Sequence, residues 1–190
     1  MTPMLGIMAS QISGHLYTLT GNYDSIQTVS VGSGGQSTIT FSSIPTTYKH
    51  LQIRSIARGA NADTQTTLTI RLNSDSGSNY SYHRLIGIGS SASASGGSSV
   101  TYSYFYFGSS GTTAGTNVFG VSIIDLLDYT NTSKNKTLRF LGGTDANGAG
   151  GVSLCSGAWY NTAAVSTITL TADGGGNFDQ YSHFALYGIK

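Results

Sequence analysis

The fold class is decided by the stretch Val29-Ser30-Val31-Gly32-Ser33-Gly34-Gly35-Gln36-Ser37-Thr38-Ile39-Thr40-Phe41. Apolar and polar residues alternate on both sides of its glycine-rich centre, and a period of two is the pattern of a strand with one buried face. Val29 and Val31 alternate before the centre, and Ile39 and Phe41 alternate after it. We therefore predict two strands that form a β-hairpin around the glycine-rich turn.

The same alternation continues through the rest of the chain. Further candidate strands are residues 49–58, 66–73, 82–88, 100–107, 118–127, 136–142, 152–159, 165–171 and 181–189. Together these make about eleven strands, many at the spacing of roughly 8–12 residues that is typical of sandwiches and barrels. The 190 residues fit one domain. We predict an all-β fold, an antiparallel, jelly-roll-like β-sandwich over residues 23–190.

The composition favours strands and a weakly charged surface. Every acidic residue is Asp, there is no Glu, and charged residues make up 9% of the chain, against about a quarter in a typical domain. The usual components of exposed helices are therefore missing. Burial of a surface made of Gly, Ser, Thr, Asn and Tyr against another subunit costs little, because few charges lose their water. This favours permanent assembly, although lectin-like domains share the composition.

Charge, cysteine content and hydropathy argue against several protein classes. The net charge is +1 without a block of like charges, so the pattern of a nucleic-acid-binding protein is missing. Cys155 is the single cysteine, which leaves no internal disulfide to form. We expect no signal peptide, because no basic residue precedes the modest apolar run of residues 4–9. We expect no membrane span, because no run approaches roughly 20 apolar residues. Synthesis and assembly in the cytoplasm is the simplest expectation.

Residues 1–22 differ from the rest of the chain. Their apolar residues, among them Leu5, Ile7, Met8 and Ile12, are spread among Gly, Ser and Thr without a clean period. One interpretation is an N-terminal extended arm that reaches a neighbouring subunit or a larger particle. The other is a first strand and loop that pack on their own domain.

Three candidate strands carry large apolar residues that favour burial against another subunit. In residues 100–107, tyrosines share one face of the expected strand while Phe105 and Phe107 share the other, and residues 118–127 also carry apolar residues on both faces. The last strand stays apolar almost to the C-terminus, which suits a central or interface strand. A sandwich whose loops cover both faces is the alternative. The candidate interface residues of these segments are Tyr102, Tyr104, Tyr106, Phe184, Leu186 and Tyr187.

Catalytic and metal motifs are weak in this sequence. The histidines His15, His50, His83 and His183 lie far apart and match no zinc spacing, and no G-x-S-x-G or Walker A motif occurs. Without Glu, a pair of catalytic carboxylates would have to come from Asp125, Asp128, Asp145 or Asp173. Asp125 and Asp128 would point to opposite faces of an extended strand. We expect neither an enzyme nor a cofactor.

Two weaker patterns suggest ligands. Asn73-Ser74-Asp75-Ser76-Gly77 and Asp145-Ala146-Asn147-Gly148 place oxygen side chains at alternate positions, as calcium loops do, although Asx-Gly turns explain both without a metal. We predict no metal. Trp159, Tyr160 and Asn161 could form a sugar-stacking platform, whereas a single Trp is more often a core anchor.

Four segments resemble structural proteins of tailed-bacteriophage virions. They are Leu5-Gly6-Ile7-Met8-Ala9-Ser10-Gln11-Ile12-Ser13-Gly14, Tyr23-Asp24-Ser25-Ile26, Ile44-Pro45-Thr46-Thr47-Tyr48-Lys49-His50-Leu51-Gln52-Ile53-Arg54 and Tyr181-Ser182-His183-Phe184-Ala185-Leu186-Tyr187-Gly188-Ile189-Lys190. The resemblance implies a small β-sandwich or jelly-roll subunit of the virion, used as a capsid cement (decoration) protein or as a fibre component. It implies no catalytic residues.

These observations give a ranked set of functional hypotheses. The first is a capsid cement protein, a homotrimer that binds the major capsid protein and bridges capsomers, with no nucleic acid or membrane as partner. The alternative is a tail-fibre or receptor-binding component that recognises a host surface glycan through loops 89–99 and 108–117. A free lectin or a hydrolase is the third class, and nothing in the sequence requires it.

Overall fold

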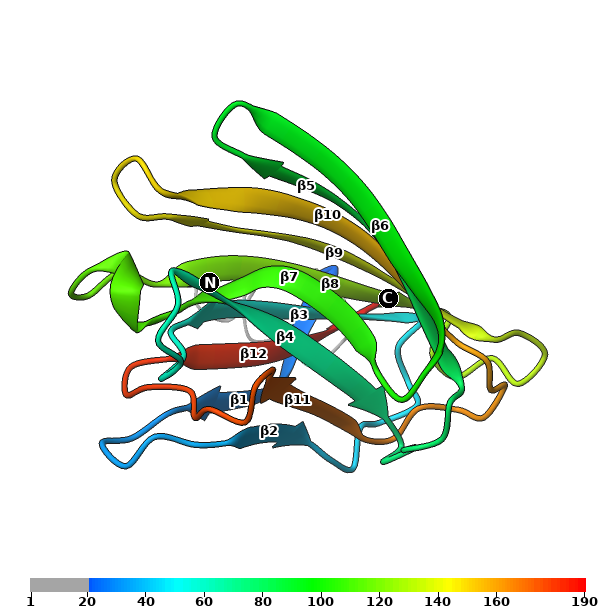
Figure 1. Cartoon of the computed structure of the whole chain (residues 1–190). Coiled ribbons are helices and arrows are strands. Elements are labelled where there is room, and N and C mark those ends of the chain that lie inside the picture. The colour runs from blue at the N-terminus through cyan, green and yellow to red at the C-terminus, as the bar shows by residue number, and fades with distance from the viewer. Residues whose placement is uncertain (1–20) are drawn as a thin grey trace, which may run out of the picture.

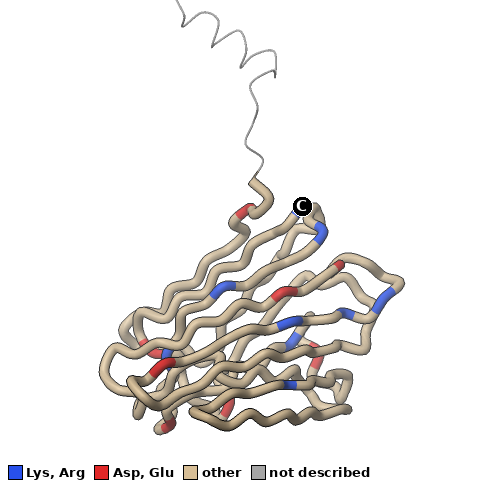
Figure 2. The backbone as a smooth tube through the Cα atoms, turned by 90° about the horizontal axis from the view of Figure 1, so that it is seen from above, with Lys and Arg blue, Asp and Glu red and all other residues tan. Residues whose placement is uncertain are grey.

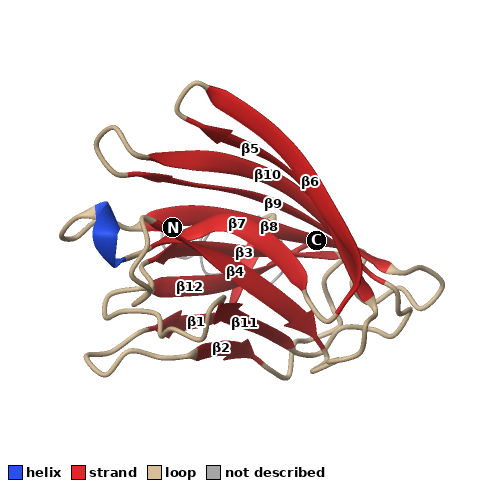
Figure 3. Cartoon of the chain, in the orientation of Figure 1, coloured by secondary structure: helices blue, strands red, loops and turns tan. Residues whose placement is uncertain are grey.

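The computed structural model describes residues 21–190, and these form an all-β sandwich (Figure 1). Strands make up nearly all the regular structure, with a single 3₁₀ turn, η1, at Thr112–Ala114 (Figure 3). The twelve strands are β1 (Tyr23–Ser30), β2 (Thr38–Phe41), β3 (His50–Ala57), β4 (Gln65–Leu72), β5 (Tyr80–Ile88), β6 (Ser91–Val100), β7 (Ser103–Ser110), β8 (Gly120–Leu127), β9 (Lys136–Asp145), β10 (Gly150–Trp159), β11 (Ile168–Ala172) and β12 (His183–Ile189).

The strands form two antiparallel sheets of unequal size. The large sheet has the order β1-β12-β3-β8-β9-β10-β5-β6, and the small sheet has the order β2-β11-β4-β7. Without the β5–β6 and β9–β10 hairpins, four strands remain in each sheet, which is a double-sheet jelly roll. The two hairpins extend one edge of the large sheet. In Figure 1 they curve away beyond β7, so the small sheet covers only part of the inner face of the large one.

The core lies between the two sheets and is rich in aromatic residues. Phe105 of β7 stacks on Phe140 of β9 with ring centroids 4.9 Å apart, which joins the sheets near their middle. Tyr80 and Trp159, side by side in β5 and β10, stack at 6.3 Å. All four side chains are at most 1% exposed. Such pairs add to the stabilisation that burial of aromatic area already provides.

Glycines let the backbone of β7 approach the large sheet. A Cβ on Gly120 would lie 2.9 Å from the backbone of Ser109 and Ser110, and a Cβ on Gly142 would lie 3.0 Å from the carbonyl oxygen of Phe107. Real Cβ atoms essentially never come as close to backbone as the one on Gly120 would, and the one on Gly142 would be tighter than nearly all real contacts and would also overlap the ring of Phe140. The close approach places the residues of β7 directly against the sheet that the hairpins extend.

The structure confirms the predicted all-β sandwich and corrects its details. The predicted hairpin around Gly32–Gly35 is wrong, because β1 pairs with β12 and β2 pairs with β11 in the other sheet. The chain crosses between the sheets there. Residues 89–99, predicted as a loop, are mostly β6, which raises the strand count to twelve. The proposed arm, residues 1–22, lies outside the described part of the chain except for its last two residues.

Candidate functional site

The outer face of the large sheet carries an unusual band of exposed apolar side chains. In β3, alternation places Leu51 and Ile53 in the core and exposes Arg54 and Ile56 on the outer face, and the neighbouring strands alternate in the same way. Seven large apolar residues are thereby turned outward, each between 40% and 62% exposed. They are Ile56, Leu85, Val121, Ile123, Leu141, Val152 and Leu154, and we call them the apolar face.

The strand register joins these residues into continuous rows. Ile123, Leu141, Leu154, Leu85 and Ala94 are direct cross-strand partners on β8, β9, β10, β5 and β6. A second row runs beside the first from Ile56 through Val121 to Val152, with Gly143 between the two valines and Gly87 beyond Val152. Isolated apolar residues on a surface need no explanation, whereas contiguous ones mark a contact surface.

A polar network borders the apolar face on β3, β8 and β9. Asp125 accepts hydrogen bonds from Gln52 Nε2 at 2.7 Å and from Arg139 Nη2 at 2.6 Å. Arg54 donates to Gln52 Oε1 at 2.8 Å, and its guanidinium lies 5.0 Å from the ring centroid of Tyr187. Arg139 is therefore paired with a carboxylate, whereas Arg54 is held by Gln52 and Tyr187 without a carboxylate partner in the described structure. A partner that covers the face meets few unpaired ions.

The outer face is large enough for a stable interface. Eight strands spaced by about 4.8 Å, each rising about 3.3 Å per residue, give a surface roughly 35 Å wide and 25 Å long. A standard protein–protein interface covers about 800 Å² on each partner, so this face alone reaches that size. The apolar rows extend from β3 and β8 to the edge strand β6, and the polar network lies beside them on β3, β8 and β9. An interface commonly combines apolar and polar areas in this way.

The predicted interface residues of the last strand fall on both sides of the large sheet. Phe184 and Leu186 are fully buried in the chain's own core, so their side chains are not open to a partner and the prediction is corrected. Tyr187 points outward and is partly exposed. The predicted arm residues Leu5, Ile7, Met8 and Ile12 lie outside the described residues.

The predicted tyrosine face does form, on the side of the molecule opposite the apolar face. Tyr104 and Tyr106 of β7, with Tyr102 just before the strand, are partly buried, while Phe105 and Phe107 are fully buried on the other side. Tyr82 and Arg84 of β5 join this cluster, and no sequence pattern marked them. A fold that places β5 beside the free edge of β7 is required to bring them together.

The predicted sugar platform does not form around Trp159. Its side chain is 1% exposed and lies against Tyr80 in the core, so the core-anchor interpretation is confirmed and the stacking prediction is wrong. Tyr160 is 58% exposed, and its hydroxyl accepts a hydrogen bond of 3.3 Å from Ser81. Asn161 accepts a hydrogen bond from the backbone of Ala163 and forms a turn.

Both calcium-like loops use their oxygen atoms within the chain. Asp75 accepts the backbone N–H of Gly77 at 2.8 Å, and Asp145 accepts that of Asn147 at 3.0 Å, so both loops form the Asx turns considered as the alternative. Asn73 Oδ1 accepts the backbone N–H groups of Ser166 and Thr167. Within residues 21–190, no three His, Cys, Asp or Glu side chains gather as potential metal ligands.

Three of the candidate acid–base carboxylates contact other side chains of the chain. Asp125 is paired with Arg139, Asp128 with Lys134, and Asp173 accepts a hydrogen bond from the hydroxyl of Tyr104. Each of these three carboxylates thus has its own partner, and none of them is hydrogen-bonded to another carboxylate in the described residues. In the described part of the chain, no helix is both long and apolar enough to cross a membrane.

Comparisons of the chain with protein-family models, with curated proteins and with solved structures find no match.

The apolar face was only partly visible in the sequence. Val121 and Ile123 opposite Ile124 and Leu126 indicated a strand apolar on both sides, whereas Leu85 and Leu154 gave no comparable signal. Each of these two leucines looks like an ordinary core residue in its own strand. Only the pairing of β5 with β10 shows that they point outward together.

Proposed function

We propose that the protein is a structural subunit of a tailed-phage virion that assembles with copies of itself through the apolar face. In this proposal it acts as a capsid cement protein that bridges capsomers of the major capsid protein. The observation that carries the proposal is the row of outward apolar residues in register across five strands. The resemblance of four sequence segments to virion proteins supports the particle context.

A second copy of this chain is the occupant that fits the apolar face best. The face combines uncharged rows with a border that holds one ion pair, Asp125 with Arg139, and one arginine, Arg54, that lies against Tyr187. It therefore complements another apolar face better than a strongly charged surface. Charged residues are also sparse and scattered over the rest of the molecule (Figure 2). Burial of apolar area at about 25 cal/mol per Å² provides the driving force.

A trimer suits this surface and the particle. Three subunits that turn their large sheets toward a common axis bury three copies of one patch in a closed arrangement. Capsid lattices have local three-fold positions, where such a trimer contacts several capsomers at once. Its loops would then bind the major capsid protein, and the shell would be stabilised by the sum of several interfaces.

The assembly step is tested with charge substitutions on the apolar face. Sedimentation velocity of the unchanged protein should give a mass about three times the 19.8 kDa of one chain. Leu141→Asp and Leu154→Asp place carboxylates in the centre of the interface and should yield monomers. Thr40→Asp adds the same charge to an exposed position of the small sheet and should leave the trimer intact.

The particle location is tested separately by gold labelling of virions in the electron microscope. Label over the head supports the cement role, and label at the tail tip favours the fibre alternative. An unchanged protein that stays monomeric at high concentration overturns self-assembly through this face, as does a Leu141→Asp variant that remains trimeric.

A further inference from the structure

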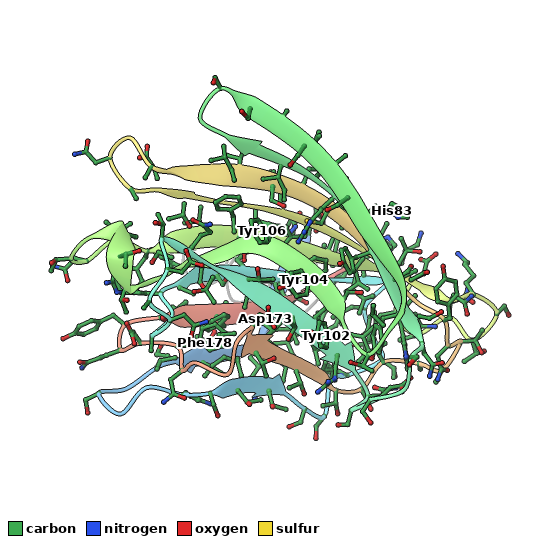
Figure 4. The ribbon with its side chains drawn as sticks, in the orientation of Figure 1. His83, Tyr102, Tyr104, Tyr106, Asp173 and Phe178 are labelled. Carbon is green, nitrogen blue, oxygen red and sulfur yellow. The ribbon has the colours of Figure 1, made fainter. Side chains whose placement is uncertain are left out.

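On the side opposite the apolar face, tyrosines line a trough between β7 and the β5–β6 hairpin. Figure 4 shows Tyr102, Tyr104 and Tyr106 one after another along β7, with Asp173 next to them. The rings of Tyr102 and Tyr104 stack with centroids 5.9 Å apart, and Tyr82 of β5 stacks on Tyr104 at 5.6 Å. We call this surface the tyrosine trough.

Two guanidinium groups belong to the trough. Arg84 lies 4.8 Å from the ring centroid of Tyr106 and 5.5 Å from that of Tyr104, and Arg71 lies 5.5 Å from that of Tyr102. Among residues 21–190, neither arginine has a carboxylate within salt-bridge distance. Contacts with aromatic faces partly compensate the two charges. Such contacts do not use the N–H groups, so the guanidinium can still bind an anion.

The hydrogen bonds of the two arginines leave donors free. Arg84 donates through Nε to Ser95 Oγ at 2.7 Å, while its Nη1 is buried without a hydrogen-bond partner in the described structure. Arg71 donates through Nε to the carbonyl oxygen of Thr101 at 3.0 Å. Each bond orients one edge of the guanidinium. A planar group held in this way can bind a carboxylate with two parallel hydrogen bonds.

The trough has room for a ligand. A hollow of about 480 Å³ is lined by Tyr82, Arg84, Val100, Thr101, Tyr102 and Tyr104. A second hollow of about 330 Å³ adjoins it at Tyr102 and extends past Arg71 to Asp173 and the glycines that follow. Both volumes lie in the range of small-molecule sites. The two hollows together form an elongated surface, which suits a chain of sugar rings better than a single compact molecule.

Small residues on β6 keep the trough open. Ser93, Ser95 and Gly97 are the cross-strand partners of Ile86, Arg84 and Tyr82. A Cβ on Gly97 would lie 2.8 Å from the ring of Tyr82, so glycine at this position allows the ring to lie flat against the strand. The serine hydroxyls can both donate and accept hydrogen bonds. The β6 side of the trough therefore adds serine hydroxyl groups to the tyrosine rings of the β5 and β7 sides.

We infer that the tyrosine trough is a binding site for an acidic oligosaccharide. The apolar faces of the sugar rings would lie on Tyr102 and Tyr104, a sugar carboxylate would pair with Arg71, and the remaining oxygen of Asp173 would accept sugar hydroxyls. The trough faces away from the apolar face, so an assembled subunit keeps it accessible. The inference gives the glycan-binding alternative a different location from Trp159.

Isothermal titration calorimetry on the full chain tests the inference. The acidic probes are a hexamer of galacturonic acid and a trimer of α2,8-linked sialic acid, and the neutral probe is maltohexaose. We expect at least one acidic probe to bind at least tenfold more tightly than the neutral one. Arg71→Gln and Tyr102→Ala should each weaken that binding at least tenfold. Lys49→Gln and Tyr160→Ala, which alter exposed residues outside both the trough and the apolar face, should leave it unchanged.

Each contrary result has a distinct meaning. Equal binding of the neutral probe overturns the acidic specificity. An equal loss with Lys49→Gln indicates non-specific attraction to positive charge and overturns the site. Lack of binding by both acidic probes also overturns it. The same titrations on the Leu141→Asp variant separate this inference from the proposed assembly, because trough binding should persist in monomers.

Discussion

The indole Nε1 of Trp159 donates a hydrogen bond of 2.7 Å to Oδ2 of Asp75. The same carboxylate accepts hydrogen bonds from the side chain of Asn79 and the backbone of Gly77. A loop whose sequence resembles a calcium loop is therefore a clamp on the only tryptophan of the chain. Asp75 and Trp159 are far apart in the sequence, and their contact ties the β4–β5 connection to the end of β10.

Removal of this carboxylate should destabilise the sandwich. Asp75→Ala leaves the buried indole N–H without an acceptor, and an unsatisfied buried donor costs about 1–3 kcal/mol. Chemical denaturation followed by Trp fluorescence measures the change in the free energy of unfolding. Asp63→Ala removes a carboxylate from an exposed loop and serves as the control. Equal stabilities of the two variants would contradict the clamp.

Stability at acidic pH should depend on Asp75. The hydrogen bond from Trp159, helped by Asn79 and Gly77, lowers the pKa of Asp75 below its ordinary 3.8. A carboxyl with a lowered folded pKa stabilises the fold above its unfolded pKa, and this contribution is lost as the pH falls through the folded pKa. We expect thermal melts between about pH 2 and pH 5 to show a shallower pH dependence in Asp75→Asn.

Stability at alkaline pH should depend on two tyrosines. Burial is the main cause that raises the pKa of Tyr80 to about 12, and burial with the hydrogen bond to Asp173 raises the pKa of Tyr104 to about 12. Their contribution is complete below the unfolded tyrosine pKa of about 10 and is lost as the pH rises through the folded value. The denaturant concentration at the unfolding midpoint should therefore decrease as the pH is raised from about 10 to 12. In Tyr80→Phe this decrease with pH should be less steep.

The buried Lys136 should contribute far more to the stability of the fold than the exposed Lys134. Lys136 is 1% exposed, and its Nζ donates to the carbonyl oxygens of Asn131, Lys134 and Thr162. Lys136→Met leaves these acceptors unpaired and should cost about 2–4 kcal/mol. Lys134→Met breaks an exposed ion pair and should cost no more than about 1 kcal/mol. If urea titrations gave equal losses in the free energy of unfolding for the two variants, the hydrogen bonds of Lys136 would not contribute to stability as predicted.

Two adjacent residues of β9 should separate stability from assembly. Phe140 is buried against Phe105, and Phe140→Ala should lower the free energy of unfolding by about 3–5 kcal/mol. Leu141 is 56% exposed on the apolar face, so Leu141→Ala should change the stability of the monomer by no more than about 0.5 kcal/mol. Only Leu141→Ala should weaken self-association selectively, which sedimentation across a concentration series measures.

The fold class was predictable because alternation is a local property. A period of two marks a strand whatever its neighbours are, and it located most strands of the sandwich, including β3, β9 and β12. The pattern failed at β6, whose residues are Ser, Ala and Gly apart from Val100. Pairing with β5 over nearly its whole length holds this segment as a strand against its weak propensity.

The connection at Gly32–Gly35 shows the limit of local signals. A glycine-rich loop permits a sharp turn, but it does not determine which sheet receives the next strand. Here β2 joins β11 in the small sheet because Ile39 and Phe41 are buried there against the core. The hairpin prediction failed since both arrangements have the same local pattern.

The sequence by itself determined that this protein is a sandwich of strands with a polar, weakly charged surface and aromatic residues to bury. Only the tertiary structure decided which side of each strand is covered. Leu85 and Leu154 form one outward row, and Arg84 meets the tyrosines of β7, because the two hairpins extend the large sheet beyond the small one. Sheet pairing joins residues that are distant in sequence, and alternation alone carries no information about those partners.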